Sequence, residues 1–166
     1  MLGRATYVAG PGEWPEAEEK GRVILDYEDR YRRRVRLLAE CGKAVQLDLD
    51  EVTRLSDGDG LALEEGGFVR VVAAEEPVAD LRCRGLVETA RIAWHVGNRH
   101  IPIQVLDDGT LRIRHDHVIE AMAESLGASV TRLRAPFSPE PGAYKGANGK
   151  AFHTHDADGH GHHHGH

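Results

Sequence analysis

The order of the alternating segments between residues 78 and 133 limits the possible folds more than any other feature of this chain. The hydrophobic pattern predicts a strand at 78–83, a helix at 85–98, strands at 101–106 and 111–114, a helix that begins near His117, and a strand at 128–133. Asp116 can cap the second helix and Gly127 can end it. The order β-α-β-β-α-β is that of the ferredoxin-like plan, in which two helices cover one face of a four-stranded antiparallel sheet. This plan hosts many functions, so it predicts no activity.

The first 75 residues are predicted to be rich in strands. Short runs with many branched residues occur at 22–27, 31–38, 43–49 and 68–73, and glycine-containing turns separate them. The turn Asp57-Gly58-Asp59-Gly60 superficially resembles a calcium loop, but it lacks the further acidic ligands, so we interpret it as a tight turn. Short strands at this spacing, with no convincing helix among them, predict a small sandwich or barrel-like domain.

The chain is therefore predicted to have an α+β fold in three parts. These are a β-rich N-terminal domain at 1–75, a ferredoxin-like domain at 76–136, and a disordered, His-rich tail at 137–166 that follows the ordered region after Pro136. No stretch approaches the ~20 apolar residues of a membrane span, and the first residues lack the apolar core of a signal peptide. We expect a cytoplasmic protein without membrane contact, in which Cys41 and Cys83 are reduced.

The net charge of −6, with histidines neutral, argues against general nucleic-acid binding, which requires a basic footprint. Residues 29–36 are a local exception, because a strand there would place four arginines on one face: Arg30, Arg32, Arg34 and Arg36. That face is either a solvated surface or a docking surface for an acidic protein partner.

The last fourteen residues carry seven of the chain's eleven histidines: His153, His155, His160, His162, His163, His164 and His166. Neutral imidazole binds Zn²⁺, Cu²⁺ and Ni²⁺ well near pH 7. The intervening glycines let such a segment fold around an ion in many ways, which suits metal capture and transfer better than catalysis. Purification tags are usually uninterrupted histidine runs, whereas glycines and acidic residues interrupt this one.

Two further groups of histidines are candidate metal ligands. Gly97 and Asn98 are natural helix-ending residues, and they would leave His100 at the edge between a loop and a strand. A lone histidine is more often structural, and we interpret His95 in that way. His115 and His117 converge on one ion only if the backbone between them is extended or turned, and they are otherwise incidental neighbours of a helix cap.

Together these segments resemble one known family. Residues 97–104, residues 114–118 and the His-rich C-terminus are similar to those of the UreE urease accessory proteins, a family of nickel metallochaperones. The resemblance implies that His100 is the principal metal ligand and that His115 and His117 correspond to a peripheral His-x-His pair. It further implies a homodimer in which His100 from each subunit binds one ion across the two-fold axis. The expected role is delivery of Ni²⁺ to apo-urease in a complex that contains a GTPase accessory protein.

Two other functions remain as alternatives. A metal storage or detoxification protein for Ni, Zn or Cu would need the tail but not the segment at 97–104. A metal hydrolase is disfavoured because the chain has no His-Glu-x-x-His, no Gly-x-Ser-x-Gly and no phosphate-cradling glycine loop, so we expect no enzyme activity. Nickel itself is implied only by the resemblance, because Cu²⁺ binds imidazole more tightly than Ni²⁺, and Zn²⁺ or Cu²⁺ can bind in vitro.

Overall fold

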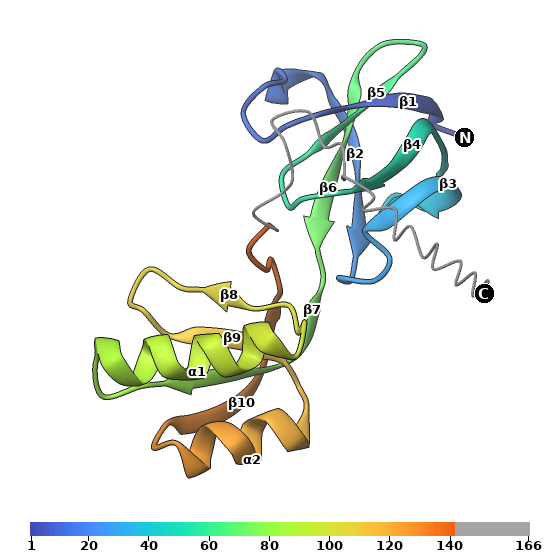
Figure 1. Cartoon of the computed structure of the whole chain (residues 1–166). Helices are drawn as coiled ribbons and strands as arrows, with labels where there is room; N and C mark the ends of the chain where they lie inside the picture. Colours follow the sequence, from blue (N-terminus) through green and yellow to red (C-terminus); the bar gives the residue numbers. More distant parts are fainter. Residues whose placement is uncertain (142–166) are drawn as a thin grey trace, which may run out of the picture.

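The computed structural model describes residues 1–141, which form two β-sheets (Figure 1). The first sheet contains β1 (Gly3–Ala9), β2 (Glu19–Leu25), β3 (Tyr31–Leu38), β4 (Ala44–Arg54), β5 (Gly60–Leu63) and β6 (Phe68–Ala73), in the order β2-β6-β5-β1-β4-β3. A short 3-10 helix (Glu16–Glu18) precedes β2. The backbone amide of Glu40 donates to the carbonyl of Arg22 at 2.9 Å, which brings the two edge strands toward each other. The sheet is therefore curled, in agreement with the predicted β-rich first domain.

The sequence did not predict β1 and β5, although they lie at the centre of the first sheet. The residues that β1 turns into the core include Ala5 and Ala9, which are small, so the strand carries few of the branched side chains by which strands are recognised. β5 has only four residues, beginning at Gly60. The core that these strands close consists mainly of Val and Leu, including Val23, Val45, Leu47, Leu61, Val69 and Val71.

The two carboxylates of the turn before β5 accept backbone amides, one from the turn itself and one from β6. The carboxylate of Asp57 accepts the backbone amide of Ala73, and that of Asp59 accepts the backbone amide of Ser56, both at 2.7 Å. These carboxylates are therefore occupied by the chain, which supports the interpretation of this segment as a turn.

The second sheet confirms the ferredoxin-like prediction. Its strands are β7 (Glu75–Arg82), β8 (Gln104–Val105), β9 (Leu111–Arg114) and β10 (Ser129–Pro136), and its helices are α1 (Leu86–Asn98) and α2 (His117–Ser125). The strand order is β10-β7-β9-β8 and all neighbours are antiparallel. β8 is much shorter than the strand predicted at 101–106. Asp116 caps α2 by accepting the amides of Val118 and Ile119, as predicted.

Both helices cover the same face of the second sheet. Alternate residues of β7 and β9 meet the inward faces of α1 and α2 in one core: Ala79, Leu81, Leu111 and Ile113 from the strands, and Ile92, Val96, Ile119 and Ala123 from the helices. On the opposite face, Asp80 forms a two-pronged ion pair with Arg112, at 2.6 and 2.9 Å. Neither helix in the described part of the chain is long and apolar enough to cross a membrane.

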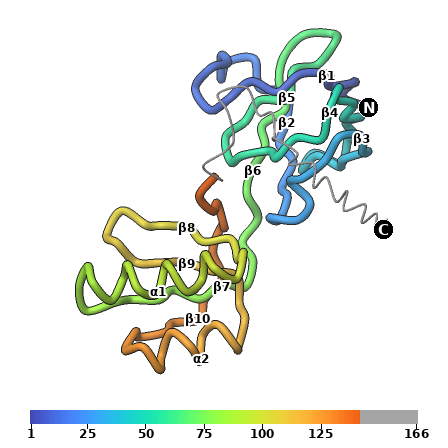
Figure 2. Tube along the Cα trace, viewed as in Figure 1, coloured from blue at the N-terminus to red at the C-terminus, as the bar shows by residue number. Residues whose placement is uncertain are grey.

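This topology gathers three connections at the end of the second sheet that adjoins the first sheet, which we call the linker end. They are the loop at 99–103, the turn at 115–116 and the segment after β10 (Figure 2). Phe137, which the sequence analysis assigned to the tail, is fully buried there, and its ring centroid lies 5.3 Å from that of Tyr27. The backbone amide of Tyr27 also donates to Glu76 at 2.8 Å. The two sheets are thus joined by specific contacts as well as by the chain.

Replacing Asp59 by Asn should stabilise the fold at neutral pH. Burial raises the pKa of Asp59 to about 6, above its ordinary value of 3.8. Since the folded-state pKa is the higher one, the stability contributed by the protonated acid is fully present below pH 4 and is lost as the pH rises through 6. Asn is a neutral mimic of the protonated acid, so Asp59→Asn should gain up to about 3 kcal/mol at pH 8.

Urea unfolding at pH 8 and pH 5 measures this difference, which should be smaller at the lower pH. Asp50→Asn, at an exposed position, controls for the loss of one negative charge. A gain that is the same at both values of pH would contradict the assignment.

Candidate metal centre

His100 has an unusual backbone at the end of α1. The helix ends at Asn98, Arg99 is its cap, and His100 follows with φ of 56°, the only non-glycine residue among 1–141 with positive φ. Its amide donates to the carbonyl of Gly97 at 2.9 Å, which closes the last turn. Glycine or asparagine normally occupies this position, and a histidine there costs roughly 1 kcal/mol. A strained residue that the surrounding structure maintains is a mark of function.

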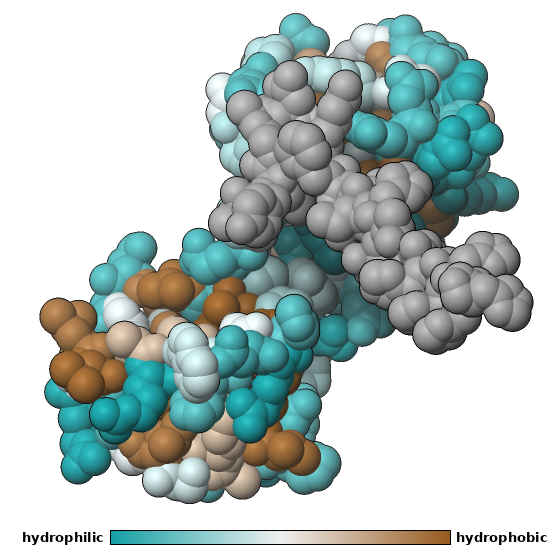
Figure 3. Space-filling view, viewed as in Figure 1, coloured by the Kyte–Doolittle hydropathy of each residue, from teal (hydrophilic) through white to brown (hydrophobic). Residues whose placement is uncertain are grey.

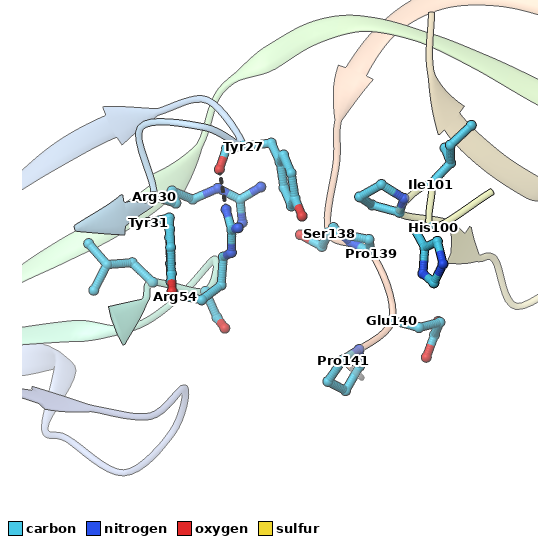
Figure 4. A pocket seen from close by; sticks show the side chains of 13 residues that line it. Tyr27, Arg30, Tyr31, Arg54, His100, Ile101, Ser138, Pro139, Glu140 and Pro141 are labelled. Carbon is cyan, nitrogen blue, oxygen red and sulfur yellow. Dashed lines mark hydrogen bonds between the residues drawn. The ribbon is translucent and has the colours of Figure 1, made fainter. Parts of the chain in front are cut away.

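The exposed His100 ring borders a pocket of about 670 Å³ between the two sheets (Figure 4). Tyr27 and Arg54 line it from the first sheet, and Glu140 lies on the side of His100. The guanidinium carbon of Arg54 lies 4.2 Å from the Tyr27 ring centroid and 4.7 Å from that of Tyr31. His100 and Glu140 contribute the only imidazole and the only carboxylate among the residues that line this pocket. The pocket alone is therefore a poor cage for a cation.

His115 lies at the start of the turn before α2 and is held by Glu120. Its Nδ1 is 2.5 Å from Oε1 of Glu120. The same oxygen accepts the backbone amide of Asp116 at 3.0 Å, and Oε2 of Glu120 accepts the guanidinium group of Arg132 at 2.6 Å. Burial acts to raise the pKa of Glu120, but the hydrogen bonds from Arg132, His115 and the Asp116 backbone outweigh it and hold this pKa below its usual value. Glu120 is thus a buried, ionised acceptor.

His115 and His117 line different pockets. His115 borders a small pocket with Ile101 and Pro102, whereas His117 borders a different pocket with Glu124. Across residues 1–141, no three His, Cys, Asp or Glu side chains are grouped closely enough to hold a metal ion. A complete site would therefore need ligands from a second chain or from beyond residue 141.

Other residues singled out in the sequence have simpler surroundings. His95 is half-buried and its ring centroid lies 5.0 Å from that of Trp94, which agrees with a structural role. The seven tail histidines, His153, His155, His160, His162, His163, His164 and His166, lie outside the described residues.

The basic run at 29–36 differs from the expected four-arginine face. Arg30 precedes β3 and is buried, donating to the carbonyls of Asp26 and Phe137, and its burial lowers its pKa. Arg32 and Arg34 form ion pairs with carboxylates of the same domain. Two of the four arginines of β3 are therefore paired within the chain.

Sequence reasoning missed Glu120. Glu120 is an acidic residue in the first turn of α2, outside the apolar pattern from which the helix was predicted. The available signal was an acidic residue five positions after His115 and four after the helix cap Asp116, from which it can reach back over the start of the helix.

Two family models together match nearly the whole chain. The model described as UreE urease accessory protein, N-terminal domain, matches residues 4–74, and the corresponding C-terminal domain model matches residues 76–166. Proteins named urease accessory protein UreE from Bradyrhizobium sp. strain BTAi1 and Rhodopseudomonas palustris strain BisB18 are 50% and 49% identical over 141 residues, which is 85% of this chain. The aligned region spans 68% and 66% of their lengths. The protein of the same name from Rhodobacter capsulatus is 44% identical over 93% of this chain and 98% of its own length.

Replacing His100 by Gly should leave the protein at least as stable, because glycine adopts positive φ without strain. We expect a gain of roughly 1 kcal/mol in the free energy of unfolding. The matched control is His95→Gly inside α1, where glycine should cost about 1 kcal/mol. Urea unfolding of both variants measures the contrast. An equal loss of stability in the two variants would show that His100 is held there for the fold.

Proposed function

Because the chain belongs to the UreE urease accessory protein family, we propose that it is a metallochaperone that carries Ni²⁺ to apo-urease during assembly of the urease active site. It binds and transfers the ion and performs no catalysis. The names of its relatives refer to urease, and they support this role for the present chain. The partners that we propose are a second copy of the chain, the GTPase accessory protein and apo-urease, in the cytoplasm.

The observation that carries the proposal is the exposed imidazole of His100 on a strained backbone. The strain is unnecessary for ending the helix, since glycine would end it better. A histidine at this position fits a side chain that serves in binding. An imidazole is a good ligand for Ni²⁺, although a single one holds the ion weakly.

Dimerisation would supply the missing ligand. A two-fold axis beside His100 would place two identical imidazoles around one ion. The exposed hydrophobic residues of α1 support such an interface: Trp94 has 62% of its surface exposed, and Leu86 and Val87 have 88% and 74%. Figure 3 shows hydrophobic surface over the end of the second domain where α1 begins. Large exposed apolar residues on one helix are typical of a binding surface.

The three parts of the chain would then have separate tasks. We propose that the unit at 1–75 contacts the partner proteins, that the unit at 76–136 holds the shared ion, and that the tail from 137 onward gathers further ions through its histidines. Glu140 lies in the same pocket as His100, so the start of the tail is close to the proposed ion. His115 and His117 would provide weaker peripheral ligands.

The shared site can be tested in a chain that ends at residue 152 and so lacks all seven tail histidines. Calorimetric titration should find one Ni²⁺ per two chains. His100→Ala should weaken this binding by at least tenfold, or about 1.4 kcal/mol, because it removes both imidazoles at once. His95→Ala should leave the affinity unchanged, and His115→Ala should have a smaller effect than His100→Ala.

The same titration decides between delivery and storage. Loss of all Ni²⁺ binding on removal of the tail would favour a storage protein that uses the tail alone. Unchanged affinity and stoichiometry in His100→Ala would rule out the shared site.

The proposed interface predicts that Trp94→Glu converts the dimer into a monomer. A buried tryptophan at an interface contributes about 2 kcal/mol or more, which corresponds to roughly a 30-fold weaker association. Val105→Glu is the control, since it introduces the same charge at an exposed apolar residue outside α1. Sedimentation equilibrium over a range of concentrations measures both. A dimer of unchanged affinity in Trp94→Glu would place the interface elsewhere.

A further inference from the structure

Glu120 is the most deeply buried carboxylate near any candidate ligand, with 3% of its side chain exposed. It lies in the first turn of α2 and is contacted by three polar groups: the backbone amide of Asp116, the guanidinium group of Arg132 in β10, and Nδ1 of His115. Two of these contacts explain its place in the fold, because they fasten the start of α2 to the sheet. The third is made to the imidazole of His115, whose side chain is partly exposed.

We propose that Glu120 is a positioning residue that fixes the His115 ring with its proton on Nδ1, so that Nε2 is presented as a ligand for a divalent transition-metal ion. The inference rests on the proposed function, since it treats His115 as one of the chain's metal ligands. The ligating atom is then Nε2 of His115, and Glu120 is the residue that selects it.

The hydrogen-bond pattern determines the position of the proton. The Asp116 amide and the Arg132 guanidinium group can only donate, so both oxygens of Glu120 already act as acceptors. At 2.5 Å from one of these oxygens, Nδ1 completes the set as a donor. A neutral imidazole that carries its proton on Nδ1 has its free lone pair on Nε2. Carboxylate–histidine pairs orient metal ligands in this way in many proteins.

The arrangement separates His115 from His117. The His115 side chain is 43% exposed and borders a pocket of about 270 Å³ with Ile101 and Pro102, which directly follow His100. His117 borders another pocket and has no side-chain hydrogen bond to any residue of the described chain. A ring that is already oriented loses less conformational freedom when it binds an ion. Of the two, His115 should therefore be the stronger ligand.

The position of the proton can be measured directly in the full-length, metal-free protein. In protein with ¹⁵N-labelled histidines at pH 8, the nitrogen chemical shifts distinguish a protonated Nδ1 from a protonated Nε2, and His115→Ala identifies the His115 signals. We expect a protonated Nδ1 on His115. A ring that carries its proton mainly on Nε2 would overturn the proposal, and this test requires no variant of Glu120.

The role of Glu120 is tested by Glu120→Gln. The amide group must turn its NH₂ toward one of the former donors, so the preference for a proton on Nδ1 should weaken and a mixture of tautomers should appear. Glu124→Gln is the control, because Glu124 is exposed on the same helix and does not bind His115. Arg132→Gln removes the ion pair on the other oxygen and should leave the His115 tautomer unchanged. Unchanged tautomers in Glu120→Gln would overturn the proposal.

Metal binding is measured on the same full-length samples by adding Ni²⁺ and following the paramagnetic loss of the His115 ring signals. In Glu120→Gln we expect about tenfold more free Ni²⁺ to be needed for half loss, whereas Glu124→Gln should match the wild type. If Ni²⁺ broadens His100 but never His115, this inference fails while the proposed chaperone function stands. If Ni²⁺ reaches neither histidine, the proposed function fails as well.

Discussion

The antiparallel pairing of β7 with β10 determines where the candidate ligands of the second domain lie. It joins eight residue pairs, from Arg82 with Ser129 to Glu75 with Pro136, so the first and last strands of the domain run side by side. Each helix or strand that runs antiparallel to β7 therefore ends at the linker end, and the loop that follows it lies there. His100 and His115 belong to different connections and are brought to this end by topology alone.

The same pairing places the first sheet beside these histidines. Since β10 ends opposite the start of β7, the chain leaves it next to the linker, and Phe137 becomes buried between the domains against Tyr27. Arg114 adds ion pairs with Glu28 at 2.8 Å and Glu76 at 3.2 Å. The pocket beside His100 is a consequence of this junction, and its two walls come from parts of the chain far apart in sequence.

The parts of this structure that sequence could predict are those determined by local chemistry. The order of elements after residue 75, the Asp116 cap and the exposed position of His100 follow from periodicity and helix-ending residues. β1 was missed because its buried residues are glycine and alanine, and Phe137 because neighbouring prolines resemble a disordered segment. The ion pair of Glu120 with Arg132 was not predicted either, because Arg132 lies in β10, which is placed by its pairing with β7.

The two histidines at the linker end are held in different ways. His100 lies on a strained backbone, and no group of three potential ligands among residues 1–141 includes it, whereas His115 is hydrogen-bonded to a buried carboxylate. A protein that keeps its metal surrounds it with ligands on rigid elements. A carrier protein must release its metal ion. A site shared between two chains loses ligands as soon as one chain moves away from the other. An ion held at either histidine would therefore be transferable, because residues 1–141 provide no complete set of ligands for it.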